Sequence, residues 1–426
     1  MLKLGKTERG VELFSPYKNI IYNLNGTTWE VIKAVKKYGS EIAIKKTASL
    51  FEISEKEAKE DIETVLKNLK NLAIDIDNIP TTVPDEIYAP RIVHFDITPK
   101  CNSNCMYCLS SDRMSNQAEL STEKILNIIK ELNNLGMWVL TVSGGEPLLR
   151  KDVFKILDHV KRMNIPIRFF TNGMLIDDLT AEKLSRYKDT MIVQVSLDSS
   201  NPKHHDTQRG VNGSFQKTVK GIKNLMKYDV TPIVAAVITP LTLDDIDDTV
   251  AFLHDLGINY VRIGNAQLYS YKALSYMDEI NLDAEKAKLL GEKINNLSRK
   301  YESSMRFSLS PHMMDYAQDP SKSYDLAVCT AGITSLYISS SGDIYPCIAL
   351  SNPELVIGDV KKDSVVDIWK NSPLLKKLRN LSVNDFEKCK SCTVKNICKG
   401  GCRGNSYEYS KSLKSYDPIY CSYFNK

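Results

Sequence analysis

Three cysteines in one short loop constrain this chain more than any other feature. Cys101, Cys105 and Cys108 lie within eight residues, a spacing at which one loop can wrap a corner of an iron–sulfur cube. A four-iron cluster normally takes four thiolates, but the next cysteine in the chain is Cys329. The spacing therefore predicts a cluster in which three irons have protein ligands and the fourth iron is left to bind another molecule.

An aromatic residue, Tyr107, directly precedes the last cysteine of this loop. The loop resembles the signature of the radical S-adenosylmethionine (SAM) superfamily. That resemblance implies that the free iron of a [4Fe-4S] cluster binds the amino and carboxylate groups of SAM. An electron from the reduced cluster would then cleave SAM to methionine and a 5'-deoxyadenosyl radical, which removes a hydrogen atom from the substrate. A zinc site and three unrelated buried thiols are the alternatives.

The composition is that of a globular protein with more than one domain. The chain has 426 residues, of which 42% are hydrophobic and 25% charged, and this length predicts two or three domains. No apolar stretch is long enough to span a bilayer and the first residues lack a secretory apolar core, so a cytoplasmic protein without a membrane partner is expected. Ten cysteines in such a chain favour metal-binding thiols over disulfides.

Residues 1–76 are predicted to form a small winged-helix-like α+β domain. Alternating apolar residues predict strands at 11–14 and 20–24, and helical periodicity follows at 28–38, at 42–51 and from Ser54 to Leu72. Ser54 and Glu57 have the spacing of a capping box. Residues 73–76 are predicted to return as a strand. Residues 77–90, with three prolines and little periodicity, are predicted to be a linker.

The first domain resembles the peptide-binding chaperone of pyrroloquinoline quinone biosynthesis. The similarity lies in Leu24-Asn25-Gly26-Thr27 leading into a helix, and in the capped third helix. It implies a recognition element for ribosomally made, post-translationally modified peptides, which binds the leader of a precursor peptide as an added strand. With 13 basic and 11 acidic residues the domain has no strong phosphate-binding stripe, so no nucleic acid partner is expected.

Residues 91–310 are predicted to form a partial (β/α)6 barrel of the α/β class, because strands and helices alternate along them. Such sheets place their chemistry at the carboxyl ends of the strands, and the cysteine loop follows the first strand. Predicted helices start near Ser121, Asp152, Asp177, Ser214 and Leu243. The six predicted strands are 92–97, 138–142, 166–170, 191–197, 233–238 and 260–263.

Polar and glycine-rich residues follow several of these strands. The second strand ends in a Gly-Gly-Glu-Pro motif, whose glycines allow close backbone approach and whose Glu146 can accept a hydrogen bond from a cationic amine. By resemblance, this motif holds the SAM amino group and Arg209 lies near the SAM carboxylate, while Ser196 and Asp198 could bind the ribose. No catalytic side chain is assigned beyond the cluster. The predicted SAM contacts are Tyr107, Gly144, Gly145, Glu146, Pro147, Asn172, Ser196, Asp198 and Arg209.

Seven cysteines in residues 311–426 match the order of the SPASM extension of radical SAM enzymes, which carries two auxiliary iron–sulfur clusters. The resemblance implies a proximal cluster bound by Cys329, Cys347 and Cys402. It implies a distal [4Fe-4S] cluster bound by Cys389, Cys392, Cys398 and Cys421. No cysteine lies between Thr330 and Pro346, so the proximal cluster is either an open [4Fe-4S] cluster, one capped by another side chain, or a [2Fe-2S] cluster. A zinc-bound folding staple is the alternative.

Together these features predict a radical SAM/SPASM peptide maturase that forms a thioether or carbon–carbon cross-link. Its expected partners are a precursor peptide and an electron donor such as flavodoxin or ferredoxin. A first alternative is maturation of another substrate, either conversion of a sulfatase residue to formylglycine or modification of a tetrapyrrole. A second alternative is a zinc-stabilised winged-helix protein that binds DNA or acts as a scaffold.

Overall fold

The computed structural model describes residues 3–7, 10–15, 20–71, 74–79, 89–109, 119–267, 270–309 and 329–424. The chain divides into two compact units, Met1–Tyr88 and Ala89–Lys426. The boundary between them falls inside the stretch that the prolines predict to be a linker. The barrel and the cysteine-rich segment, expected as separate domains, belong to the same unit.

The first unit is an antiparallel sheet followed by helices. Its strands are β1 (Lys3–Thr7), β2 (Gly10–Ser15) and β3 (Ile20–Asn25), in the order β1-β2-β3. Strand β1 was not predicted. Helix α1 (Gly26–Phe51) is broken at Gly39, where φ is 75°, so the two predicted helices are its two segments. In α2 (Glu55–Asn71) the capping box is present, with the Ser54 amide donating to Glu57 at 2.9 Å.

The core of the first unit joins its sheet to its helices and to the segment that follows them. The buried residues are Leu13, Leu24, Trp29, Ile32, Leu69, Ile74 and Ile79. The prediction of a returning strand is wrong for the described residues 74–76. Asp75 instead accepts a hydrogen bond from the Asp77 amide at 3.0 Å, which turns the chain into the short 3-10 helix η1 (Ile76–Asn78).

The second unit is built on a ten-stranded sheet with the order β10-β9-β8-β7-β6-β5-β4-β11-β12-β13. All six predicted barrel strands are present and parallel, and the sheet also contains two parallel strands that were not predicted, β10 (Arg306–Leu309) and β11 (Ser335–Ile338). The six are β4 (Ile92–Asp96), β5 (Val139–Ser143), β6 (Ile167–Thr171), β7 (Met191–Ser196), β8 (Ile233–Ile238) and β9 (Tyr260–Asn265).

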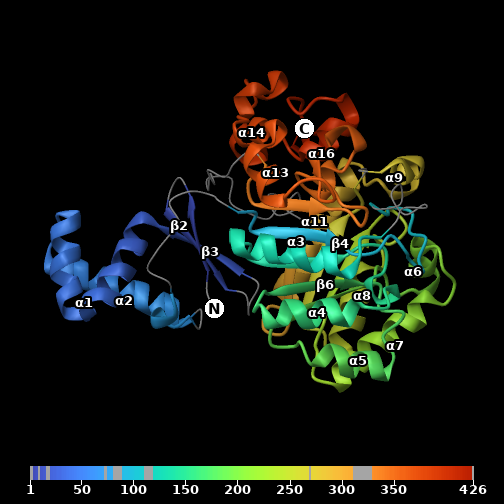
Figure 1. Ribbon diagram of the computed structural model, residues 1–426, viewed down its shortest axis with the longest axis horizontal. Coiled ribbons are helices and arrows are strands. Elements are labelled where there is room, and N and C mark those ends of the chain that lie inside the picture. Colours follow the sequence, from blue (N-terminus) through green and yellow to red (C-terminus); the bar gives the residue numbers. More distant parts are fainter. Residues whose placement is uncertain are drawn as a thin grey trace. The chain divides into compact units, whose positions relative to one another are not determined.

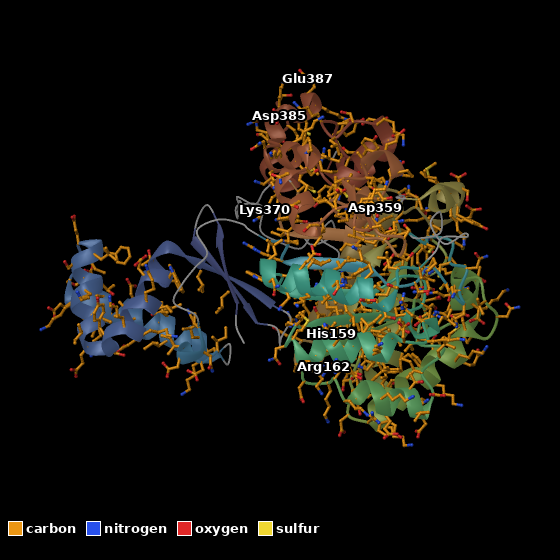
Figure 2. All side chains as sticks on the ribbon, in the orientation of Figure 1. His159, Arg162, Asp359, Lys370, Asp385 and Glu387 are labelled. Atoms are coloured by element: carbon orange, nitrogen blue, oxygen red, sulfur yellow. The ribbon has the colours of Figure 1, made fainter. Side chains whose placement is uncertain are left out.

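Helices cover the outer face of these strands (Figure 1). In α3 the buried residues Ile125, Ile128, Ile129 and Leu132 follow helical spacing, and Ser121 and Gly136 cap its two ends. Charged side chains such as Arg162, in the last turn of α4, lie on exposed helix surfaces (Figure 2). The helices of this region are α3 (Thr122–Leu135), α4 (Val153–Arg162), α5 (Asp178–Ser185), α6 (Pro202–Arg209), α7 (Ser214–Lys227), α8 (Ile246–Asp255) and α11 (Ala284–Lys300). Two short helices, α9 (Tyr271–Ser275) and α10 (Met277–Ile280), instead share a buried cluster with Tyr107 of the cysteine loop.

The C-terminal segment extends the barrel sheet. Strand β11 (Ser335–Ile338) pairs in parallel with β4, and β12 (Asp343–Tyr345) and β13 (Gly358–Asp359) follow antiparallel. One hydrophobic core runs from the barrel into this segment. Its helices are α13 (Val365–Asn371), α14 (Pro373–Arg379), α15 (Lys395–Cys398), α16 (Arg403–Ser410) and α17 (Pro418–Phe424). Among the described residues, no helix combines the length and apolar character needed to cross a lipid bilayer.

Candidate active site

The cysteine loop begins five residues after the last residue of β4. Its three thiols are partly exposed, and the Cys108 amide donates to the Cys105 carbonyl at 3.3 Å, which closes a turn between them. Burial, followed by smaller contributions that include the neighbouring Cys105 thiol, raises the pKa of Cys101 to about 11. A metal ion would lower it again, because metal binding deprotonates thiols. The loop therefore offers partly accessible sulfur ligands at the carboxyl end of a parallel strand.

The Gly-Gly-Glu-Pro motif binds the backbone that leads into this loop. The Gly145 amide donates to the Thr98 carbonyl at 2.8 Å, and the Glu146 amide donates to the Lys100 carbonyl at 2.7 Å. A Cβ atom at Gly144 would lie 2.3 Å from the Thr98 carbonyl oxygen, and one at Gly145 would lie 2.1 Å from the Lys100 carbonyl oxygen. Both glycines thus allow a close approach as predicted, but here they approach the backbone that leads into the cysteine loop.

We expect Gly145→Ala to abolish or strongly reduce 5'-deoxyadenosine formation, because the added methyl group displaces the backbone beside Cys101. The measurement is chromatographic quantification of 5'-deoxyadenosine after anaerobic reconstitution and reduction. Gly26→Ala is the control, since a Cβ at Gly26 meets no atom within 4 Å and this glycine has no positive φ. An unchanged rate in Gly145→Ala would show that the loop can shift without cost.

Glu146 connects this motif to the end of β6. Its carboxylate is fully buried and accepts hydrogen bonds from the Thr171 hydroxyl at 2.8 Å, the Asn172 amide at 2.8 Å and the Leu148 amide at 3.1 Å. Burial raises the pKa of Glu146 to about 7 against the effect of these donors. A carboxylate accepts about four hydrogen bonds, so one position is left for the predicted bond to an amine. Pro147, also buried, starts the following turn.

Asn172 reaches from the end of β6 to the cysteine loop. Its side-chain amide donates to Asn102 at 2.7 Å and to Ser103 at 3.4 Å, and its side-chain oxygen accepts from the Met174 amide at 3.0 Å. Sequence reasoning missed Asn102 and Ser103, which lie between the first two cysteines. Their polar side chains in a ligand loop were the available signal.

Asp198 and Arg209 form a buried ion pair beside the same loop. The Arg209 Nε and Nη2 atoms donate to the two carboxylate oxygens at 2.8 Å, and Nη1 lies 3.8 Å from the Cys105 sulfur. The Tyr107 hydroxyl also donates to Asp198, and the guanidinium lies 5.5 Å from the Tyr107 ring centre. Burial would raise the pKa of Asp198, but mainly the Arg209 charge lowers it below its usual value.

This pair changes how two predicted contacts are interpreted. Arg209 is 8% exposed and its guanidinium is paired with Asp198. The Asp198 carboxylate accepts hydrogen bonds from Arg209, from Tyr107 and from the Val237 amide at 3.0 Å. Asp198 therefore holds the cysteine loop in place, and a bond to the ribose would be additional to these contacts. Ser196, at the end of β7, is partly exposed, and its role as a ribose ligand stays a prediction.

Helix α6 holds the other side of the loop. Its last residues accept hydrogen bonds from the loop backbone, from Asn104 N to Arg209 O at 2.9 Å and from Met106 N to Gln208 O at 3.1 Å. His204 and His205 lie in this helix. His205 is buried and accepts from the Asp198 amide at 3.2 Å, and burial lowers its pKa to about 4.

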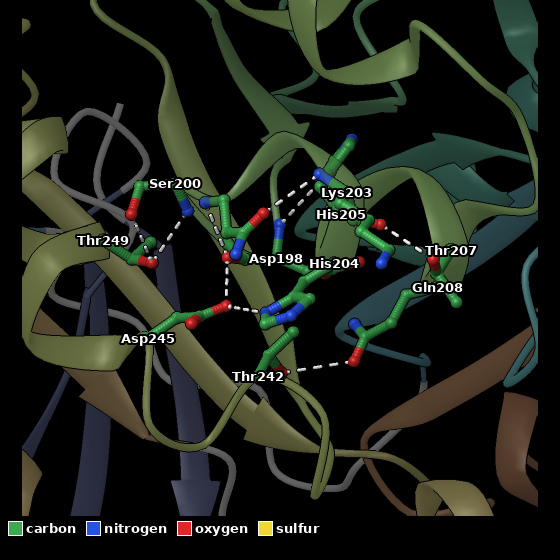
Figure 3. A network of polar contacts seen from close by, with 12 residues as sticks. Asp198, Ser200, Lys203, His204, His205, Thr207, Gln208, Thr242, Asp245 and Thr249 are labelled. Carbon is green, nitrogen blue, oxygen red and sulfur yellow. Dashed lines mark hydrogen bonds and ion pairs between the residues drawn. The ribbon is translucent and has the colours of Figure 1, made fainter.

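A polar network fixes α6 to the neighbouring strand–helix unit (Figure 3). His204 lies 2.7 Å from Asp245, the Ser200 amide donates to Thr249 at 2.9 Å, and Gln208 accepts from Thr242 at 3.2 Å. The contacts at both edges of the cysteine loop therefore come from elements that the barrel itself orients.

The C-terminal thiols gather in two sets. Burial raises the pKa of Cys347 well above its usual range, and the nearby Cys329 and Cys402 thiols raise it further. Burial likewise raises the pKa of Cys398 to about 12, and the nearby Cys389 and Cys421 thiols also raise it. The pKa of Cys389 is raised by burial and then by the Cys392 thiol.

The donor chemistry of both sets fits iron–sulfur clusters, which take cysteine thiolates. Within the described ranges, no three His, Cys, Asp or Glu side chains are close enough to share a single metal ion, whereas the thiolates of a cluster bind different irons. Asp417 connects segments that carry predicted ligands of both sets, because its carboxylate accepts from the Cys402 amide at 3.0 Å and its carbonyl accepts from the Cys421 amide at 2.8 Å.

Comparisons with known proteins agree with this site. The model of the radical SAM superfamily matches residues 95–256, and that of the SPASM iron–sulfur cluster-binding domain matches residues 329–393. The chain is 30% identical to the antilisterial bacteriocin subtilosin biosynthesis protein AlbA of Bacillus subtilis, over 79% of this chain and 71% of AlbA. It is 27% identical to the AdoMet-dependent heme synthase of Methanosarcina barkeri, over 79% of this chain and 97% of the synthase.

The fold is similar to that of Streptococcus suis SuiB in its crystal structure with the precursor peptide SuiA. The TM-score is 0.72 at 20% identity, and the similarity covers 99% of this chain and 98% of SuiB. The chain thus belongs to the radical SAM superfamily and has a SPASM-type iron–sulfur domain. It is an enzyme whose cofactors are a [4Fe-4S] cluster and SAM.

Proposed function

We propose that this enzyme is a peptide maturase, in which the first unit captures the leader of a ribosomally made precursor peptide and the barrel cross-links its core through a thioether or carbon–carbon bond. The first unit is the observation from which we infer a peptide substrate. This unit is a three-stranded sheet with helices, and the similarity to SuiB includes it. SuiB was crystallised with a precursor peptide, and AlbA is a bacteriocin biosynthesis protein.

The sheet of the first unit offers a place for a peptide strand. Strand β2 is central and β3 lies at an edge. Within the described part of the chain, the side of β3 away from β2 has no paired strand. An extended peptide can add to such an edge through backbone hydrogen bonds, while side-chain pockets select its sequence.

Two adjacent proline substitutions test this interface. Tyr22 and Asn23 pair with Leu13 and Glu12 of β2, and in an antiparallel pair neighbouring residues alternate between bonding the partner strand and facing away from it. One of Tyr22→Pro and Asn23→Pro therefore removes an outward amide, and the other removes an amide that bonds β2. We expect the variant that loses the outward amide to bind the leader more weakly while its fold stays intact. Fluorescence anisotropy measures the binding and circular dichroism measures the fold, both on the full chain.

Two outcomes would contradict leader binding at β3. If the variant that retains native circular dichroism binds a labelled leader as tightly as wild type, the leader does not add to β3. Equal loss of binding and of secondary structure in both variants would also contradict a role for the outward amide.

The chemistry follows from the cofactors and from the electron count. With the cluster and SAM bound, the site supplies removal of a hydrogen atom from carbon. Forming a new bond then requires the loss of one further electron and one proton from the peptide. We assign the auxiliary clusters as the acceptor of that electron, with four thiols for a distal [4Fe-4S] cluster and three for a proximal cluster. A flavodoxin or ferredoxin would supply the electron that cleaves SAM.

Heme synthesis is the second candidate, because the heme synthase similarity covers 97% of that relative. The two functions separate in one experiment. The reconstituted enzyme is incubated with SAM and reductant, with either peptides encoded by neighbouring genes or an iron porphyrin precursor. Our proposal predicts a peptide that has lost two hydrogen atoms, detected by mass spectrometry. Conversion of the porphyrin with no change in any peptide would refute it.

A further inference from the structure

Arg403 is a large, fully buried cation next to an auxiliary ligand. It is 0% exposed and begins α16 directly after Cys402. Its guanidinium lies 4.2 Å from the centre of the Phe386 ring. Its two terminal nitrogens donate to the backbone carbonyls of Gly400, Gly401, Leu413 and Ser415. Stacking and four acceptors together fix the orientation of the guanidinium.

One donor of this guanidinium is left over. The Arg403 Nε atom is buried and has no hydrogen-bond acceptor among the described residues. A buried, unsatisfied donor on a charged group is costly and rare in native proteins, so Nε requires an acceptor outside the polypeptide, which can be a water, an ion or a cofactor atom. The neighbours of Arg403 favour a cofactor atom.

The surroundings of Arg403 identify that cofactor. Burial lowers the pKa of Arg403, and the nearby Cys329 and Cys402 of one thiol set, the Asp417 carboxylate and Cys389 of the other thiol set act in the opposite direction. The carbonyls of Gly400 and Gly401, which Arg403 binds, belong to the short turn between Cys398 and Cys402. Arg403 thus borders the ligands of both auxiliary clusters.

We propose that Arg403 lies between the two auxiliary clusters, donates its Nε hydrogen to a sulfur atom of one of them, and raises the reduction potential of both. This inference rests on the proposed assignment of the auxiliary thiols. Hydrogen bonds to cluster sulfurs and nearby positive charge stabilise the reduced, more negative cluster. Arg403 is then a positioning residue that favours transfer of an electron from the substrate to the auxiliary clusters.

The test is a redox titration of the anaerobically reconstituted full-length enzyme, followed by electron paramagnetic resonance. Both auxiliary midpoint potentials should shift to more negative values in Arg403→Met and shift less in Arg403→Lys, which keeps the charge. With arginine labelled by 15N in its guanidinium, pulsed resonance should detect 15N coupling to one reduced auxiliary cluster. That coupling should disappear in Arg403→Lys.

Arg379→Lys is the matched control. Arg379 lies 4.5 Å from the Trp369 ring centre and donates to two carbonyls, but only burial lowers its pKa, with no effect from a thiol. Its substitution should leave both potentials and the 15N coupling unchanged.

Three results would overturn the proposal: unchanged potentials in an Arg403→Met enzyme with full iron content, absence of 15N coupling in wild type, or coupling that persists in Arg403→Lys. If Arg403→Met loses iron, the 15N coupling in wild type and in Arg403→Lys decides. These readouts need no substrate, so a failure to modify peptides would count against the proposed function and leave the role of Arg403 standing.

Discussion

Cys105→Ala is expected to reduce 5'-deoxyadenosine formation to the background level. Cys105 is the middle thiol of the loop, with an Arg209 nitrogen 3.8 Å from its sulfur, and the loop offers only three thiols in all. A four-iron cluster left with two protein ligands would not hold the geometry in which its open iron binds SAM. The measurement is chromatography of the reaction after anaerobic reconstitution and chemical reduction.

Cys347→Ala is the matched variant in the other part of the enzyme. Its thiol is grouped with Cys329 and Cys402 and takes no part in the loop. We expect SAM cleavage to continue largely unchanged while peptide cross-linking stops, because the electron that leaves the substrate has lost its acceptor. Cross-linked product from both variants would show that the proposed electron path is wrong.

Arg209→Leu is expected to destabilise the barrel by about 3–5 kcal/mol at pH 8, the usual cost of leaving one member of a buried ion pair alone. Asp198 is 0% exposed, so water cannot replace the guanidinium. Without Arg209, burial raises the pKa of Asp198 in the folded state. The difference in the free energy of unfolding between wild type and Arg209→Leu should therefore shrink as the pH falls toward about 4, where Asp198 of the unfolded chain also binds a proton. The denaturant midpoint, measured anaerobically at several pH values, reports this loss.

The double variant Asp198→Asn/Arg209→Leu is the control for this prediction. It removes both charges and still offers an acceptor to the Val237 amide, which donates to Asp198 at 3.0 Å. It should lose less stability at pH 8 than Arg209→Leu alone. Equal losses in the two variants would mean that packing of the arginine, and not its charge, stabilises this part of the barrel.

The strands were predictable because parallel strands buried on both faces carry apolar runs. Strand β8 matches its predicted bounds, Ile233–Ile238. Helix α6 escaped prediction because Pro202–Arg209 contains no aliphatic residue apart from Pro202 and no Phe, Tyr or Trp, and its buried ring is that of His205. Capping forms it instead, with Asn201 accepting from the Lys203 amide and Gly210 at φ 65°. The missed strand β10 has only four residues, too few for a clear period.

The candidate site, like the fold, was predictable only in part. The cysteine spacings and the resemblance to radical SAM/SPASM enzymes give the ligand sets, which stay a prediction. The contacts that orient the loop could not be predicted, because Gly144 and Gly145 meet backbone carbonyls, and a backbone contact leaves no sequence signal. Asp198 was expected at the ribose, but its ion pair with Arg209 depends on a tertiary contact across β7 and α6.

The parallel pairing of β4 with β11 has a consequence for electron transfer. Strand β4 leads into the loop of Cys101, and β11 lies between Cys329 and Cys347 in the chain. Ile92 to Phe95 are in register with Ser335 to Ile338. If clusters are bound as proposed, this backbone ladder would hold the distance between the SAM cluster and the proximal auxiliary cluster fixed, and a fixed distance gives a constant tunnelling rate, whereas a hinged arrangement would let that rate fluctuate.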